Sequence, residues 1–309
     1  MLFFVVVPLI WSFSAVGPSA GRRRARRAAT SSDYLLDAAV SAAREAGALI
    51  VSASPEDRVS SETKATAKNL LTKVDVACQD IIVKTLLSMV PESRILGEEN
   101  VAPGAAASAL AAKEAMDKDG LVWVIDPIDG TANFVDGIPL STVSIACVLR
   151  DEVLVGVVYD PFRDELFQAA KGQGATLNGK TLQVSKITKL DDAIIYAGCP
   201  PTNASLKPSL RGICAVAPKS RTMRLLGSAA LMLAYVAAGR GAAYFEADLS
   251  AWDTAAGACL IKEAGGQITD ADNQTYRPST TRQILATNGH IHNDLFAILD
   301  EVNGIRLDN

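Results

Sequence analysis

The stretch Leu121-Val-Trp-Val-Ile-Asp-Pro-Ile-Asp-Gly-Thr-Ala-Asn133 decides the fold, because a buried strand in it ends in a turn that carries two carboxylates. Leu121–Ile125 is an apolar run long enough for one buried strand. The proline and the glycine that follow end this strand and force a tight turn. Asp126 and Asp129 therefore leave the core three residues apart. Carboxylates that close repel each other and need a compensating cation, and oxygen-only ligands suit hard divalent ions such as Mg²⁺.

The composition is that of a globular protein with an acidic body. The chain has 309 residues, of which 49% are hydrophobic and 21% are charged, so it can bury a substantial core. The formal net charge is −4, but residues 1–27 hold five arginines and no acid, which leaves −9 on the remainder. An acidic body argues against nucleic-acid binding. If it handles phosphates, metal ions must supply the local positive charge.

Residues 1–30 are expected to be a targeting presequence outside the folded domain. Residues 2–17 are almost wholly apolar, which is short of the roughly 20 residues of a membrane anchor and fits a signal-peptide core. Residues 21–32 are rich in arginine and free of acids, as in transit peptides. Two interpretations stay open: a plastid address reached through a secretory signal, and a plain signal peptide for the secretory pathway. Neither predicts stable membrane insertion.

The remainder, 31–309, is expected to form one α/β domain with approximate halves 31–188 and 189–309. Periodicity and breakers predict helices over 32–50, 75–87, 205–216 and 252–263, another ending at 236, and strands over 93–97, 121–125, 142–149, 153–158, 165–169, 193–198 and 241–245. A polar hairpin is expected over 58–72 and a turn at Asn178-Gly179. The alanine-rich segment 102–116 is interpreted as a surface insertion with one or two helical turns.

Several chemistries are excluded by what the sequence lacks. The cysteines are odd in number, widely spaced and free of CxxC pairs, which indicates buried free thiols: Cys78, Cys147, Cys199, Cys214 and Cys259. The only histidines, His290 and His292, lie on a turn-like stretch that is expected to be a solvated loop. No Gly-x-Ser-x-Gly or P-loop motif is present, so serine-hydrolase and P-loop chemistry are unsupported. The groups that remain as candidates for catalysis are carboxylates, a threonine and backbone amides.

Three separated motifs now carry a resemblance. Gly97-Glu-Glu99, Asp126-Pro-Ile-Asp-Gly-Thr-Ala-Asn133 and Trp252-Asp-Thr-Ala-Ala-Gly257 occur in the order found in the inositol monophosphatase family. The chain resembles this family of magnesium-dependent, lithium-sensitive phosphatases from about residue 33 to 300. The resemblance implies a layered α-β-α-β-α sandwich of the sugar-phosphatase type and a small phosphorylated alcohol as substrate. Family members are often homodimers.

The resemblance also implies a site with two to three Mg²⁺ ions. Glu99, Asp126 and the backbone carbonyl of Ile128 are expected to hold one ion. Asp126, Asp129 and Asp253 are expected to hold a second, and a third, weaker ion is expected near Glu99. Two nearby metals can clamp a phosphate while one of them activates a water molecule.

The remaining catalytic groups follow from the same resemblance. Thr131 is expected to hydrogen-bond the attacking water and to be oriented by Asp75, while Glu99 helps as base. The amides of Gly130, Thr131 and Ala132, at the start of a helix, are expected to receive phosphate oxygens.

Substrate contacts are implied at four further positions. Glu246 is expected to hold sugar hydroxyls, a task that Asp129 shares, and Ser228 and Ala229 match a substrate-side turn. Lys64 matches a lysine on the family's mobile loop, which approaches the metals.

The choice of substrate is weighed on two short stretches. Asn133-Phe134 resembles the inositol branch, whereas relatives acting on histidinol phosphate or 3′-phosphoadenosine nucleotides tend to carry a lysine where Ala132 stands. Animal inositol enzymes have a histidine and a cysteine before the Trp-Asp motif, and this chain has Asp248-Leu-Ser-Ala251 instead. An inositol-phosphate phosphatase is therefore expected. The alternatives are a histidinol-phosphate phosphatase, a 3′-phosphoadenosine nucleotide phosphatase, and an inactive binding protein of the same fold.

Overall fold

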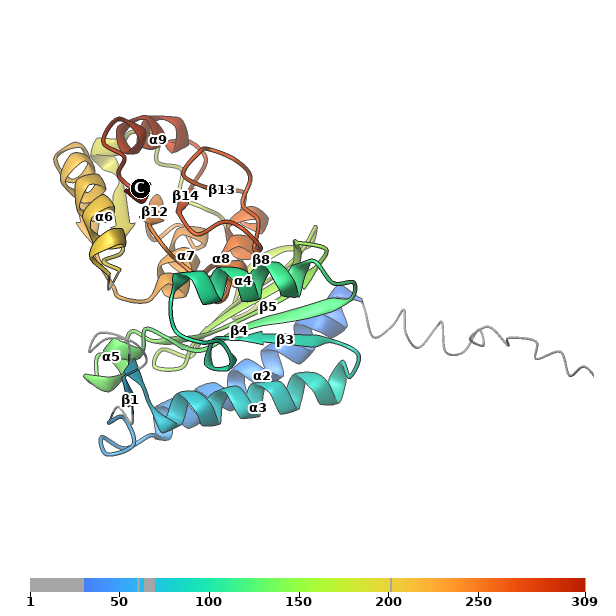
Figure 1. Cartoon of the computed structure of the whole chain (residues 1–309). Coiled ribbons are helices and arrows are strands. Elements are labelled where there is room, and N and C mark those ends of the chain that lie inside the picture. Colours follow the sequence, from blue (N-terminus) through green and yellow to red (C-terminus); the bar gives the residue numbers. More distant parts are fainter. Residues whose placement is uncertain (1–30, 60–61, 64–69, 201, 309) are drawn as a thin grey trace, which may run out of the picture.

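The computed structural model describes residues 31–59, 62–63, 70–200 and 202–308, and these form alternating layers of helix and sheet (Figure 1). One pair of helices covers a seven-stranded sheet, a second helical layer separates that sheet from a five-stranded one, and a third helical layer covers the far face. This arrangement confirms the expected α-β-α-β-α sandwich. Among the described residues, no helix is long and apolar enough to cross a membrane.

The outer helices α2 (Ser32–Ser52) and α3 (Lys73–Met89) pack on each other and on the larger sheet. The buried face of α2 consists mostly of alanines, which lets the sheet approach closely. At Gly47 an added Cβ would lie 2.4 Å from the ring of Tyr159. Helix α3 begins with a capping box in which the backbone N–H of Thr72 donates to Asp75 at 2.8 Å. Of the hairpin expected over 58–72, the structure describes the antiparallel pair β1 (Glu62–Thr63) and β2 (Leu70–Leu71), and residues 64–69 between them lie outside the described part.

The larger sheet has the order β3-β4-β5-β6-β7-β8-β9, with only β3 and β4 parallel. Its strands are β3 (Arg94–Gly97), β4 (Leu121–Asp129), β5 (Thr142–Leu149), β6 (Glu152–Asp160), β7 (Glu165–Ala170), β8 (Gly174–Leu177) and β9 (Lys180–Thr181). The turn between β8 and β9 is Asn178-Gly179, with φ of 48° and 79°, as the sequence predicts. Every residue of β4 is buried, because helices cover both faces of the sheet there.

The layer between the sheets contains α7 (Ala229–Ala237), α8 (Ala251–Glu263) and α4 (Ala105–Met116). Helix α4 corrects the expectation for the alanine-rich segment. It is a helix of 12 residues that contacts β3 and α8, with Ser108, Ala112 and Met116 buried. Alanine gives few amphipathic cues, because it is small enough for either a buried or an exposed face. The segment is therefore part of the fold.

The smaller sheet has the order β11-β10-β12-β14-β13. Its strands are β10 (Ile194–Ala197), β11 (Thr222–Arg224), β12 (Ala243–Glu246), β13 (Gln267–Thr269) and β14 (Ile284–Thr287), covered by α6 (Asn203–Val216) and α9 (His292–Glu301). Short helices occur at η1 (Glu98–Asn100), α5 (Thr131–Val135), η2 (Leu190–Asp192) and η3 (Ala217–Lys219). The sequence did not predict β13, β14 or α9, whose short apolar runs lie between polar turns.

The two histidines do not share one solvated loop. His290 is exposed, but His292 is buried at the start of α9, with Nδ1 3.0 Å from Thr287 Oγ1 and Nε2 3.0 Å from Asn273 Oδ1. The pair is thus divided between solvent and core, and neither histidine belongs to the carboxylate cluster described below.

Because burial lowers the pKa of His292 to about 4, this side chain should make stability depend on pH. Its pKa in the unfolded chain is about 6.5. The unfolded state therefore binds the proton first, and stability is lost as the pH falls from 6.5 through 4, by up to about 3 kcal/mol. Urea unfolding of wild type and His292→Gln at pH 7 and pH 4.5 should show that the variant loses less stability on acidification. His290→Gln is the control, and an equal pH dependence in all three proteins would contradict the prediction.

Candidate active site

Asp126 and Asp129 lie at the end of β4, where the strand leaves its ladder. The pairing of β4 with β5 shifts register between these two residues. Both are nearly inaccessible, at 2% and 7% exposed. The N–H of Ile128 donates to Asp126 Oδ1 at 3.0 Å, which turns the backbone back toward the first carboxylate. The strand and turn expected from the sequence therefore hold both acids at one point.

Asp253 reaches the same point from the first turn of α8. The N–H of Ser250 donates to Asp253 Oδ2 at 2.6 Å within a capping box, so this acid also caps its helix. One carboxylate oxygen from each of Asp126, Asp129 and Asp253 lies within 4.8 Å of the others. Segments more than 120 residues apart in the sequence thus bring together three acids that could hold a metal ion.

Burial and mutual repulsion act on all three carboxylates. Loss of hydration raises the pKa of Asp126 and Asp253 well above the ordinary value, and the neighbouring acids raise it further. Burial also raises the pKa of Asp129, to about 6, against the opposing effect of the hydrogen bonds that it accepts. Charges of one sign crowded in this way are stable only with a cation or a proton, so the donor set fits a divalent metal.

Asp129 is held by the start of α7. Its carboxylate accepts hydrogen bonds from the Ser228 hydroxyl, from Ala229 N at 3.3 Å and from Ala230 N at 2.8 Å. Ser228 and Ala229 were expected to contact the substrate directly. The structure shows them bonded to Asp129 and absent from the lining of the cavity, so here they act by fixing that carboxylate at a helix start, where an anion is favoured.

Thr131 and Asp75 meet as the resemblance implied. Thr131 Oγ1 lies 3.4 Å from Asp75 Oδ1 and 3.1 Å from the carbonyl oxygen of Ile128. Asp75 is 1% exposed, and its other oxygen accepts from the backbone of Thr72. The capping box of α3 thereby anchors the group that orients Thr131.

Of the adjacent acids Glu98 and Glu99, the structure places Glu98 at the site. Glu98 lines the cavity and Glu99 does not. Glu98 also raises the pKa of Asp126 more than Glu99 does, and it is among the main causes that raise the pKa of Asp129 and Asp253. The Glu99 N–H donates to Gln79 Oε1 at 3.0 Å, which fixes the turn. The position expected for Glu99 is therefore occupied by Glu98, and which of the two serves as metal ligand and base stays a prediction. The sequence has two acids side by side and no cue to which one faces inward.

Glu246 lies at the end of β12 and lines the same cavity, as expected. It is 8% exposed, accepts a hydrogen bond from the Tyr244 hydroxyl, and burial raises its pKa to about 7. Its carboxylate packs on Gly198, where an added Cβ would lie 1.6 Å from Oε2. Sequence reasoning missed Gly198, because the requirement comes from a strand 48 residues away.

Asn133, part of the stretch that favoured the inositol branch, links two segments next to the site through its side-chain amide. Its side-chain amide donates to the carbonyls of Leu140, at 2.9 Å, and Leu226, at 2.8 Å. It joins α5 to the segment ahead of α7. Gly130, at φ 92°, starts α5 in a left-handed conformation that favours glycine.

The cavity has a volume of about 320 Å³. Six carboxylates line it, and no basic side chain does so within the described part of the chain: Glu98, Asp126, Asp129, Glu246, Asp248 and Asp253. Ile128, Gly130, Thr131 and Ala132 line it as well. Lys64 lies outside the described residues.

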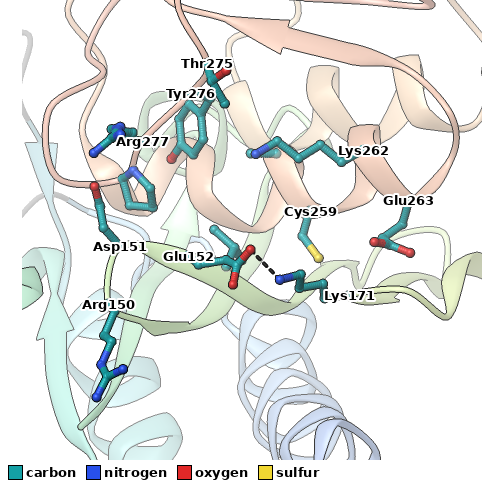
Figure 2. Close-up of a pocket in the computed structure, with 13 residues that line it drawn as sticks. Arg150, Asp151, Glu152, Lys171, Cys259, Lys262, Glu263, Thr275, Tyr276 and Arg277 are labelled. Carbon is teal, nitrogen blue, oxygen red and sulfur yellow. Dashed lines mark hydrogen bonds and ion pairs between the residues drawn. The ribbon is translucent and has the colours of Figure 1, made fainter. Parts of the chain in front are cut away.

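A second cavity, of about 380 Å³, lies beside the other half of α8 and has a different electrostatic character (Figure 2). Glu152 pairs with Lys171, as Figure 2 shows. Glu263 accepts from Gly174 N at 2.8 Å, and Asp151 accepts from the hydroxyl of Ser279 at 2.7 Å. The acids of this second cavity have hydrogen-bond or ion-pair partners within the protein. Of the described acids around these two cavities, only those of the first cavity therefore need a cation from outside the protein.

The chain is similar to known proteins over most of its length. The model of the inositol monophosphatase family matches residues 31–303. The Nus factor SuhB of Pseudomonas aeruginosa is 40% identical over 240 residues, covering 76% of this chain and 85% of that protein. Inositol monophosphatase 3 of Solanum lycopersicum is 36% identical over 272 residues, covering 87% and 97%.

Solved structures show the same fold. The extragenic suppressor protein SuhB of Bartonella henselae superposes with a TM-score of 0.77 at 33% identity, covering 86% of this chain and 98% of that one. Inositol monophosphatase from Anabaena gives 0.71 at 33% identity, covering 86% and 95%. The fold and site define a phosphoric monoester hydrolase. The chain belongs to the inositol monophosphatase family.

Proposed function

We propose that the protein hydrolyses myo-inositol monophosphate, or a related sugar phosphate, in a reaction that depends on Mg²⁺. The observation that carries this proposal is the cavity lining of six carboxylates without a basic side chain in the described part of the chain. A phosphate dianion would be repelled from such a surface. The cavity therefore suits a phosphate only together with divalent cations.

The residues that would hold the metal are Asp126, Asp129 and Asp253, joined by Glu98 and the carbonyl of Ile128. We propose two to three Mg²⁺ ions, as is typical of the family. When bound, such ions lower the pKa of water and offset the charge of the phosphate. Asp253 accepts the Ser250 N–H on Oδ2, and Asp129 accepts its two shorter hydrogen bonds on Oδ2 and a longer one, at 3.3 Å, on Oδ1, so Oδ1 of each carboxylate is the better placed oxygen for this task.

Thr131 is placed to handle the attacking water. If it donates its hydroxyl proton to Asp75, the Thr131 oxygen keeps lone pairs that can accept a proton from a water molecule in the cavity. Asp75 is held by Thr72 and cannot turn away without losing those hydrogen bonds. The first N–H groups of α5, those of Thr131 and Ala132, have no acceptor within the helix and can receive phosphate oxygens.

Glu246 is suited to the alcohol half of the substrate. Its carboxylate is fixed against Gly198 and by the Tyr244 hydroxyl, so its position is set before a ligand arrives. A buried acid that accepts hydrogen bonds favours the hydroxyl groups of a polyol. The same acid could also hold an ammonium group, which keeps histidinol phosphate as the nearest alternative.

A substrate panel tests the proposed function. With Mg²⁺ present, we expect kcat/KM for inositol 1-phosphate to exceed that for histidinol phosphate and for 3′-phosphoadenosine 5′-phosphate by at least about tenfold, a difference of roughly 1.4 kcal/mol in transition-state binding. EDTA should abolish turnover and Li⁺ should inhibit it. Brisk release of phosphate from histidinol phosphate without turnover of inositol 1-phosphate would reject the substrate. No turnover of any phosphate ester would favour a binding protein of the same fold.

A further inference from the structure

Arg282 joins two walls of the active-site cavity although it does not line the cavity itself. Its guanidinium donates to Asp248 Oδ1 from Nη2 at 2.7 Å and from Nε at 3.1 Å. Its remaining nitrogen, Nη1, donates to the hydroxyl of Ser108 at 2.7 Å. One side chain therefore connects the loop after β12 to helix α4.

Both partners of Arg282 belong to the cavity lining. Ser108 lines it together with 101–104, the segment that leads into α4, and Asp248 lines it together with Leu249 and Ser250. The Leu249 N–H also donates to the carbonyl of Arg282 at 2.7 Å, so backbone and side chain of the same residue hold this wall. The two walls are 140 residues apart in the sequence, and Arg282 ties them together.

The contacts of Arg282 with Asp248 and Ser108 are mostly buried, so water cannot easily take the place of the guanidinium. The side chains of Arg282 and Asp248 are 17% and 12% exposed, and Ser108 is 5% exposed. Asp248 adopts φ of 64°, a left-handed conformation unusual for a residue other than glycine. Without Arg282, Asp248 would be a nearly buried acid beside Glu246, and repulsion would push this wall outward.

We propose that Arg282 is a positioning residue that restricts the site to compact alcohols, by locking the wall formed by α4 against the wall formed by 248–250. The proposal rests on the proposed function and adds a determinant of its substrate range. The cavity volume of about 320 Å³ is at the small end of the roughly 300–1,000 Å³ usual for ligand sites. With both walls fixed, the width of the cavity beside Glu246 stays constant, and we expect this to favour a leaving alcohol of the size of a single sugar or cyclitol ring.

The test compares three phosphate esters in wild type and variants with Mg²⁺: inositol 1-phosphate, the bulkier adenosine 2′-phosphate, and the small p-nitrophenyl phosphate. For Arg282→Gln we expect KM for inositol 1-phosphate to rise about tenfold with kcat within about twofold. The ratio of kcat/KM for adenosine 2′-phosphate to that for inositol 1-phosphate should also rise about tenfold, while p-nitrophenyl phosphate turnover changes little. Ser108→Ala, which removes one of the two anchors, should shift the ratio in the same direction and less.

Arg277→Gln is the matched control, because Arg277 is an exposed cation on the same loop with no ion pair among the described residues. Arg282→Lys should show a smaller rise in KM and in the kcat/KM ratio than Arg282→Gln, because lysine keeps the positive charge but lacks the planar guanidinium that bonds both partners. Equal losses for all three esters, or an unchanged ratio, would overturn the proposal and leave Arg282 a purely structural residue. Wild type that hydrolyses none of the esters would instead overturn the proposed function, before any variant is compared.

Discussion

Replacing Asp126 with asparagine is expected to lower phosphatase turnover by about a thousandfold or more. Asp126 is the most enclosed acid of the cluster and the one that Asp129, Asp253 and Glu98 all repel. Asparagine keeps an oxygen to accept the Ile128 N–H but cannot supply the negative charge that a hard cation requires. Loss of one metal ligand removes several kcal/mol of transition-state stabilisation, and each 1.4 kcal/mol is a factor of about ten.

A stability measurement separates this effect from misfolding. In the absence of metal, the Asp126→Asn variant should have a Tm at least as high as that of wild type, because a buried charge among like charges has been removed. Adding Mg²⁺ should raise the Tm of wild type and have little effect on the variant. Unchanged turnover would contradict the metal mechanism. A large drop in Tm without metal would show that Asp126 supports the fold by some other contact.

The second prediction concerns Glu98 and Glu99. Glu98→Gln should reduce kcat/KM about a hundredfold and raise the Mg²⁺ concentration needed for half-maximal activity, since Glu98 lines the cavity. Glu99→Gln, the matched control, should stay within about threefold of wild type, because Glu99 does not line the cavity and glutamine keeps the backbone N–H that donates to Gln79. Measuring the activity of both variants as a function of Mg²⁺ concentration shows which of the two glutamates acts at the metal site. The reverse order of losses would restore the original assignment to Glu99.

Much of the fold was predictable where apolar runs were long and breakers strong. The predicted strand over 142–149 coincides with β5. The predicted helix over 252–263 matches α8, which begins one residue earlier, at Ala251. The predictions failed where side chains carried little information. Helix α4 is built from alanines, and β13 and β14 are short runs that pair through contacts distant in sequence.

The placement of some site residues was predicted from the sequence, and that of others was not. Asp126, Asp129, Thr131, Asp253 and Glu246 were all expected, and all lie at one cavity. Ser228 and Ala229, which were expected to contact the substrate, donate hydrogen bonds to Asp129, and their substrate role stays a prediction. The targeting address of residues 1–30 stays a prediction.

By itself, the sequence determined that a buried strand ends in two carboxylates, because apolar runs and breakers act locally. It also determined, through three motifs in order, the family to which the chain belongs. Only the tertiary structure decided which of two adjacent glutamates faces the cavity, since neighbouring residues in a turn point in different directions. It alone brought Gly198 under Glu246 and Arg282 between Ser108 and Asp248. Those contacts depend on how separate layers pack, and no local pattern of residues encodes that packing.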